Sequence, residues 1–147
     1  MFSDILFSSL SFFIALISVF VVILTTIFVI KSNKELNQQV LFANVTKEER
    51  ELNMKFQEYA EKIDKIVDGF EKDKLIFNYE TLLFNYYEYL AICLRGKLIR
   101  EIESRLYFRD LVVGVKNRFD DALIFEKAQA KKEEYRGIQW LFKRWKI

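Results

Sequence analysis

The chain has 147 residues, which is room for one compact domain, with 23 basic and 21 acidic side chains. It contains no His and one Cys, which excludes histidine bases, histidine metal ligands and an intrachain disulfide. Its 4 Gly are too scattered to form a phosphate-binding loop. We therefore expect no enzyme activity, no catalytic residues, no metal and no cofactor. The catalytic candidates that remain are carboxylates, such as Glu80, Glu88, Glu101, Asp110, Asp120 and Asp121.

The N-terminal segment has the composition of a membrane span. Residues 5–30 carry no charged side chain and consist mainly of Ile, Leu, Val and Phe. As a helix they would be roughly 39 Å long, which exceeds the hydrocarbon thickness of about 30 Å. A cleaved signal peptide is the alternative, but the start is acidic at Asp4 and Lys31 stands where small residues would be needed. The pattern predicts a transmembrane helix over residues 1–30.

The basic residues around this segment predict its orientation. None precedes it, whereas Lys31 and Lys34 follow closely, and then Lys47 and Arg50. Lys and Arg resist translocation, so they mark the cytoplasmic side. The sequence predicts a single-pass protein of the cell inner membrane, with its N-terminus outside and its C-terminal domain in the cytoplasm.

Small residues recur on one side of the predicted span at steps of three and four. This spacing places them on one face of a helix, where two backbones can approach closely. It predicts a helix-association seam, and with it a homo-oligomer or a membrane protein partner. In the alternative, the hydroxyls bond back to their own helix and face lipid. The seam residues are Ser8, Ser11, Ala15, Ser18, Val22 and Thr25.

The remainder of the chain is expected to be helical, because it has no Pro, few Gly and many Glu, Lys, Leu and Ile. Residues 31–46 are predicted to be a juxtamembrane helix extension and linker. Thr46 and Glu49 have the spacing of a capping box that would begin a new helix. Residues 47–147 are predicted to form a cytoplasmic helical domain. The fold class is therefore all-α, with one transmembrane helix followed by a small bundle of about four to five helices.

Apolar spacing divides that domain into helices. The first has inward positions that we take to be Leu52, Phe56, Tyr59, Ala60, Ile63, Ile66, Val67 and Phe70. Residues 74–94 have so wide an apolar surface that a central helix is expected, ended by Gly96 in the left-handed conformation. Two further helices are expected over residues 97–108 and 110–130, and a last one over residues 135–147.

The central helix leaves one line of polar positions at steps of three and four. The line is either a solvent-facing strip or a partly buried polar contact with another helix. Only a buried contact would bear on function, because buried polar groups must find partners. The line consists of Asn78, Thr81, Asn85 and Glu88.

The C-terminal segment combines aromatic and basic residues, which is typical of a helix lying on an anionic membrane surface. It predicts contact with membrane lipid. In the alternative, both Trp side chains belong to the bundle core. No nucleic-acid-binding motif is present, and no small-molecule substrate is evident. The candidate residues are Trp140, Phe142, Lys143, Arg144, Trp145 and Lys146.

Two segments, NYYEYLA through RGKLI (residues 85–99) and YRGIQWL (residues 135–141), resemble a family of short bacterial membrane-anchored proteins of unknown function. The resemblance implies a cytosolic helical bundle behind one N-terminal membrane helix, and no activity. It singles out Asn85, Glu88, Gly96 and Trp140.

These observations favour a membrane-anchored interaction or regulatory subunit that acts by protein–protein contacts and self-associates through its transmembrane helix. The alternative is a membrane-perturbing effector, of toxin or phage-related type, that oligomerises in the bilayer.

Overall fold

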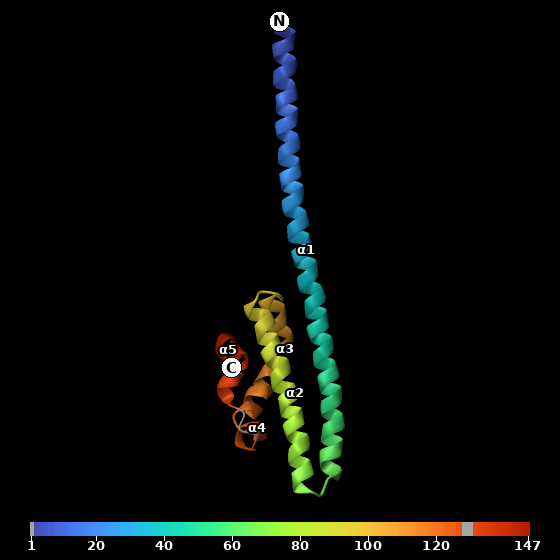
Figure 1. Cartoon of the computed structure of the whole chain (residues 1–147), viewed down its shortest axis with the longest axis vertical. Coiled ribbons are helices and arrows are strands. Elements are labelled where there is room, and N and C mark those ends of the chain that lie inside the picture. The colour runs from blue at the N-terminus through green and yellow to red at the C-terminus, as the bar shows by residue number, and fades with distance from the viewer. Residues whose placement is uncertain (1, 128–130) are drawn as a thin grey trace. The chain divides into compact units, whose positions relative to one another are not determined.

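The computed structural model describes the backbone of residues 2–127 and 131–147, and the side chains of residues 16–126 and 131–147. All regular structure in these residues is helical, which confirms the all-α class (Figure 1). In chain order the elements are α1 (Phe2–Lys65), α2 (Gly69–Arg95), α3 (Glu101–Phe119), α4 (Leu123–Lys127), a 3-10 turn (Lys132–Glu134) and α5 (Arg136–Trp145).

The first helix is not interrupted where the capping box was expected. Thr46 lies inside α1, and its hydroxyl donates a hydrogen bond of 2.9 Å to the carbonyl of Ala43. This is the usual arrangement of Thr within a helix. Because no Gly or Pro precedes Gly69, nothing breaks the helix before that region.

The first break falls after Lys65. Asp68 is the N-cap of α2, and its carboxylate accepts a hydrogen bond of 3.0 Å from the backbone N–H of Phe70. Val67 and Phe70, which were expected to face inward, are 100% and 78% exposed at this turn. The helical spacing of the preceding residues does not extend through the turn, so that expectation was wrong for both.

The chain divides into two compact units, Met1–Asn37 and Gln38–Ile147. The first contains the apolar N-terminal segment. Among the described residues, α1 is the one helix that is both long enough and apolar enough to cross a membrane. Its most apolar window has a mean hydropathy of 2.1, and none of that window is buried.

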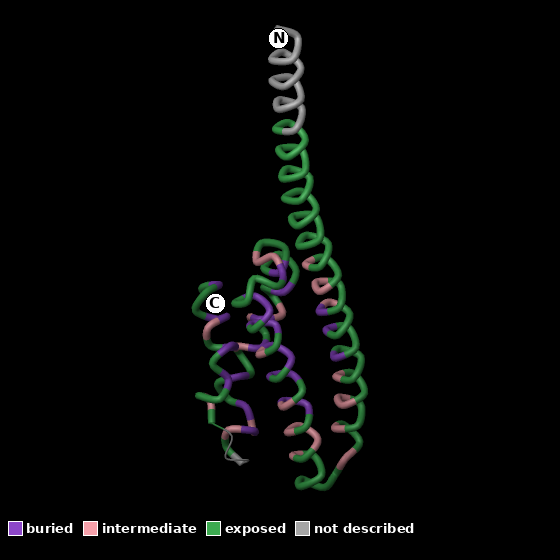
Figure 2. Tube along the Cα trace, turned by 45° about the horizontal axis from the view of Figure 1, so that its top comes forward, coloured by how far each residue is buried: buried purple, intermediate pink, exposed green. Residues whose placement is uncertain are grey.

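The second unit is built around α2. This helix contacts α3, α4 and α5, as the wide apolar surface predicted. Ten of its residues are buried, and Figure 2 shows the buried positions gathered along α2 and the shorter helices. A ring contact of 4.6 Å between the centroids of Phe56 and Tyr79 joins α1 to α2.

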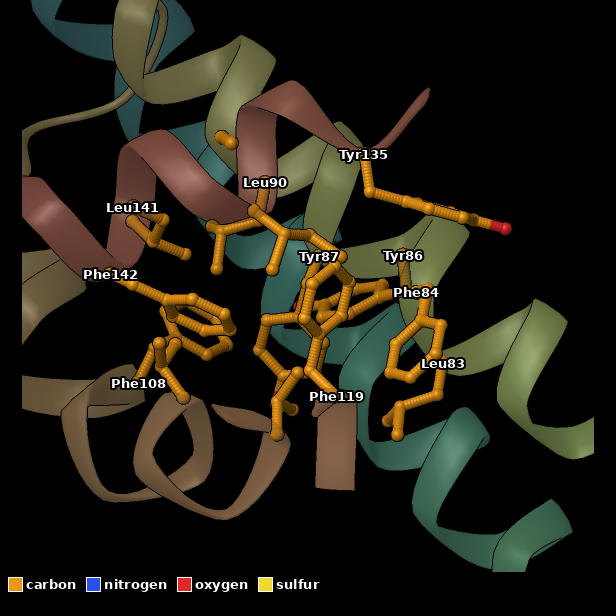
Figure 3. Close-up of a cluster of buried hydrophobic side chains, with 14 of the residues drawn as sticks. Leu83, Phe84, Tyr86, Tyr87, Leu90, Phe108, Phe119, Tyr135, Leu141 and Phe142 are labelled. Carbon is orange, nitrogen blue, oxygen red and sulfur yellow. The ribbon is translucent and has the colours of Figure 1, made fainter. Parts of the chain in front are cut away.

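The centre of this unit is aromatic. Phe84 of α2 packs against Phe119 of α3 and Tyr135, with ring centroids 5.2 and 5.6 Å apart (Figure 3). Phe119 also meets Phe142 of α5 at 5.7 Å. Most of these pairs are edge-to-face, the geometry that the ring quadrupoles prefer. The abundance of Phe in the sequence is thus partly explained by one shared cluster.

The break expected near Phe108 does not exist. Phe108 lies in the middle of α3 and is fully buried, and the helix continues to Phe119. The expected helix over residues 110–130 is therefore wrong: α3 continues to Phe119 and the short α4 covers Leu123–Lys127, while residues 128–130 lie outside the described part of the chain. Arg109 and Asp110, which we took for a boundary, are exposed helical residues.

The turn between α2 and α3 also differs from expectation. Gly96 has φ −73°, and the left-handed residue is Lys97, with φ 54°. The N–H groups of Lys97 and Leu98 close the helix by bonding the carbonyls of Leu94 and Cys93 at 3.0 and 2.9 Å. This is a Schellman motif with Lys in the place that Gly usually occupies.

Candidate functional site

Glu88 joins α2 to the first turn of α5. Its two carboxylate oxygens accept hydrogen bonds of 2.8 and 2.9 Å from the backbone N–H groups of Gly137 and Ile138. These N–H groups belong to the helix start and have no partner within the helix. The carboxylate also meets the positive end of the helix dipole. The pairing fixes where α5 begins.

Gly137 is part of the same contact. A Cβ at residue 137 would lie 2.6 Å from Oε1 of Glu88, closer than real Cβ contacts. The absence of a side chain therefore lets the carboxylate reach the backbone.

Glu80 makes a similar contact two helical turns earlier. It is only 4% exposed, and its Oε2 accepts a hydrogen bond of 2.9 Å from the backbone N–H of Ile124 in α4. Two glutamates of the central helix thus cap the first turns of two later helices. Sequence reasoning named Glu80 only as one carboxylate among several. The only signal was its position eight residues before Glu88.

The predicted polar line is split by the structure. Asn78 and Asn85 are exposed, and the Thr81 hydroxyl donates to the carbonyl of Phe77 in its own helix at 2.9 Å. Glu88, by contrast, is hydrogen-bonded to another helix. The solvent-facing interpretation therefore describes the two asparagines, and the buried-contact interpretation describes Glu88.

A second polar cluster links α1, α2 and α3. The Tyr86 hydroxyl donates a hydrogen bond of 2.9 Å to the carbonyl of Val45. Glu49, 4% exposed, accepts from the Asn53 amide and, at 3.5 Å, from the Tyr107 hydroxyl. Burial raises the pKa of Tyr86. The raised pKa favours the neutral phenol, the form that donates this hydrogen bond.

A pocket of about 440 Å³ opens between residues of α1, α2 and α3. Its wall holds the Arg118 guanidinium, whose carbon lies 5.6 and 5.1 Å from the ring centroids of Phe56 and Tyr79. Burial raises the pKa of Tyr79, opposed by Arg118. Glu80 lines the pocket, but its carboxylate is bound to the Ile124 N–H. Arg118 and Glu80, two charged residues of this pocket, are therefore both in contact with other groups of the protein.

The C-terminal residues divide between core and surface. Trp145 is fully buried and Phe142 is 9% exposed, so in the folded domain their rings pack in the bundle and not on its surface. This corrects the predicted membrane-surface set for these two residues and fits the alternative for Trp145. The apolar face of α5 is needed to cover α2 and α3, which α5 contacts.

The other predicted surface residues remain accessible. Trp140 is half-buried, while Lys143 and Lys146 are exposed. Arg144 forms an ion pair with Glu101 through contacts of 2.7 and 2.8 Å, which lowers the pKa of that carboxyl. This pair ties α5 to the start of α3.

The predicted helix-association seam lies only partly within the described side chains. Ser8, Ser11 and Ala15 fall outside them. Val22 is 63% exposed, and the Thr25 hydroxyl donates to the carbonyl of Val21 at 2.8 Å. Thr25 therefore shows the back-bonded geometry of the alternative interpretation.

The described residues offer little support for a cysteine nucleophile or for a metal site. The Cys93 thiol is 1% exposed, and burial raises its pKa, which disfavours the reactive thiolate. No group of three or more carboxylate or thiol side chains in the described part of the chain is arranged to hold a metal ion.

Comparison of the chain with protein-family models, curated proteins and solved structures finds no significant match.

Proposed function

We propose that the protein is a single-pass, membrane-anchored interaction subunit that acts by protein–protein contacts and self-associates through α1. Its N-terminus lies outside the inner membrane and its helical domain lies in the cytoplasm. The resemblance to membrane-anchored bacterial proteins agrees with this proposal but supplies no partner.

The observation that carries the proposal is the exposed apolar surface of residues 16–30. Phe28 and Ile30, for example, are 72% and 64% exposed, and no charge interrupts the segment. Soluble proteins rarely leave so large a continuous apolar surface in water. A bilayer is the solvent that matches it, since all backbone groups of a helix are bonded internally.

The proposed orientation rests on Lys31 and Lys34, which follow the segment directly. The proposed binding role rests on the hydrogen bonds that the carboxylates of the central helix form. Glu80 and Glu88, the best-placed acidic groups of the central helix, are committed to backbone N–H groups of other helices. Both carboxylates thus hold helices of the fold together, which favours a scaffold for contacts over an active site.

Cell fractionation and cysteine labelling test this proposal together. The full-length protein should resist extraction by alkaline carbonate. The native Cys93 is buried, so an impermeant maleimide should label only an introduced thiol. We expect Ser3→Cys to react in intact cells and Met54→Cys, at a site 58% exposed, to react only after the membrane is opened. Complete extraction by carbonate would rule out the anchor, and the opposite labelling would rule out the orientation.

Induced expression separates this proposal from the membrane-perturbing effector. A voltage-sensitive dye should show an unchanged membrane potential on induction. Rapid depolarisation would instead favour the effector and overturn the subunit.

A further inference from the structure

The first half of α3 presents apolar side chains to solvent. Ile102 and Leu106 are one turn apart and are 78% and 83% exposed, and Leu98, just before α3, is 49% exposed. Other apolar residues of α3, such as Phe108 and Val112, are fully buried. The helix therefore has a second apolar row that the domain does not cover.

Cations accompany this row. Arg105 and Arg109 are also one turn apart, and both line the same shallow groove as Ile102, Leu106 and Asp110. Arg105 also donates a long hydrogen bond of 3.5 Å to the carbonyl of Trp145. Lys97 adds an exposed cation next to Leu98. We call these six residues the α3 patch: Lys97, Leu98, Ile102, Arg105, Leu106 and Arg109.

The acidic side chains of α3 are engaged by arginines. Glu101 pairs with Arg144 at 2.7 Å, and Glu103 pairs with Arg100 at 3.0 Å. Asp110 lies 3.9 Å from Arg109, an exposed pair of little strength. The patch is therefore apolar with a net positive charge.

The patch begins at the end of the domain where the chain enters it. The Gln38 side-chain amide donates a hydrogen bond of 2.9 Å to the carbonyl of Lys97, and Gln38 is the first residue of the second unit. Only the residues 32–37 separate Gln38 from Lys31. These residues are helical within α1, so the segment is about 10 Å long. The interfacial layer of a leaflet is itself about 5–7 Å thick.

We propose that the α3 patch docks onto the anionic headgroup surface of the membrane that holds α1. Leu98, Ile102 and Leu106 enter the interface, and the cations of the patch meet lipid phosphates. The inference rests on the proposed membrane anchor. Because the tether is short, even a weak contact has a high effective concentration of surface available.

A second copy of the chain fits the patch less well. A two-fold dimer would bring the patch against itself and place Arg105 and Arg109 opposite the same arginines. Juxtaposed like charges oppose such pairing, whereas the headgroups of anionic lipids carry the complementary charge.

Spin labels on the full-length protein test the proposal. Single variants Ile102→Cys and Leu106→Cys are labelled with a nitroxide and reconstituted into vesicles of phosphatidylcholine and phosphatidylglycerol in equal parts. Collisions with dissolved oxygen and with a water-soluble nickel complex report whether each label meets lipid or water. Met54→Cys is the matched control for an exposed site of the domain, and Ile23→Cys reports the anchor.

We expect the labels at residues 102 and 106 to be shielded from nickel and accessible to oxygen, unlike the label at residue 54. Shielding should decrease in vesicles of phosphatidylcholine alone. In a background of Arg105→Gln and Arg109→Gln, the local binding constant should fall about fivefold for each removed cation. The control background Lys62→Gln and Lys72→Gln, which removes two exposed cations on either side of the turn between α1 and α2, should leave the shielding unchanged.

Three outcomes would overturn the proposal. If labels 102 and 106 are as nickel-accessible as label 54 while label 23 is shielded, the patch does not dock but the anchor stands. If label 23 itself is accessible to nickel, the anchor fails and the patch proposal fails with it. If labels 102 and 106 show spin–spin broadening that disappears on dilution with unlabelled protein, the patch is covered by a second copy.

Discussion

The Glu88 carboxylate occupies the space that a side chain at residue 137 would need: its Oε1 lies 2.8 Å from the Gly137 nitrogen and would lie 2.6 Å from a Cβ there. An acidic residue in α2 and a glycine 49 positions later are thus parts of one contact. The contact sets the register of α5 against the central helix, and with it the burial of Trp145.

Removing either partner should destabilise the domain. We expect Glu88→Ala to lower the free energy of unfolding by about 2 kcal/mol, because two N–H groups lose a charged acceptor in a partly buried place. Gly137→Ala should cost about 2 kcal/mol through the clash with the carboxylate. Urea unfolding of the full-length protein in detergent, followed by Trp fluorescence, measures both.

The double variant gives the sharper result. Once Glu88 is Ala, a methyl group at residue 137 has room, so the two losses should not add. A double variant that loses the full sum of the single losses would contradict the contact. Gly69→Ala, where a Cβ meets nothing within 4 Å, is the matched glycine control and should show no comparable clash.

Glu80 should contribute to the stability of the domain about as much as Glu88. Glu80→Ala leaves the Ile124 N–H without its acceptor in a buried place, and we expect a loss of about 2 kcal/mol in the free energy of unfolding. Glu80→Gln keeps an acceptor oxygen and should lose less. Asn85→Ala, at an exposed polar position of the same helix away from its first turn, serves as control. Equal stability of Glu80→Ala and the control in urea unfolding would show that the hydrogen bond contributes nothing.

The sequence was sufficient to predict the features that depend on amino-acid composition and on the spacing of apolar residues. Absence of Pro predicted the helical class, and the wide apolar surface of residues 74–94 predicted a central helix. The helix boundaries were harder, because Thr46 and Asp110 resemble boundary residues and yet lie inside helices. Local signals of this kind are weak wherever helix propensity and packing favour continuation.

The two glutamate contacts could not be predicted as contacts. The spacing of Glu88 on a polar line indicated that it either faced solvent or met another helix, and only the fold decides between the two. Glu80 gave no comparable signal. Both partners, Ile124 and Gly137, are backbone groups more than forty residues away, and backbone donors leave no mark in the sequence beyond the glycine itself.

The Glu101–Arg144 pair predicts a pH dependence. The hydrogen bonds and charge of Arg144 lower the pKa of the Glu101 carboxyl in the folded state. Its contribution to stability is therefore present above the unfolded pKa of about 4.3 and is lost as pH falls through the lower folded value. In Arg144→Gln the carboxyl should titrate closer to its ordinary value, and NMR titration of its side chain measures this. An unchanged titration in the variant would show that the pair does not form in solution.

The left-handed backbone conformation of Lys97 should lower the stability of the domain. A non-glycine residue at φ 54° is strained, and we expect Lys97→Gly to stabilise the domain by up to about 1 kcal/mol. The same change removes a cation from the α3 patch and should reduce its shielding by anionic vesicles. Thermal unfolding and the spin-label assay measure the two effects. A destabilised Lys97→Gly variant would contradict the left-handed conformation at this residue.

The most direct test of the proposed self-association through α1 is the mass of the full-length protein in detergent, measured by light scattering. We expect an oligomer for the natural chain and a monomer when Ser11, Ala15 and Ser18 are each changed to Leu, because bulk on that face prevents close helix contact. Ser9→Leu, which lies on the opposite face by helical spacing, is the control and should remain an oligomer. A natural chain that is monomeric, or a triple variant with the same mass as an oligomeric natural chain, would contradict assembly through this face.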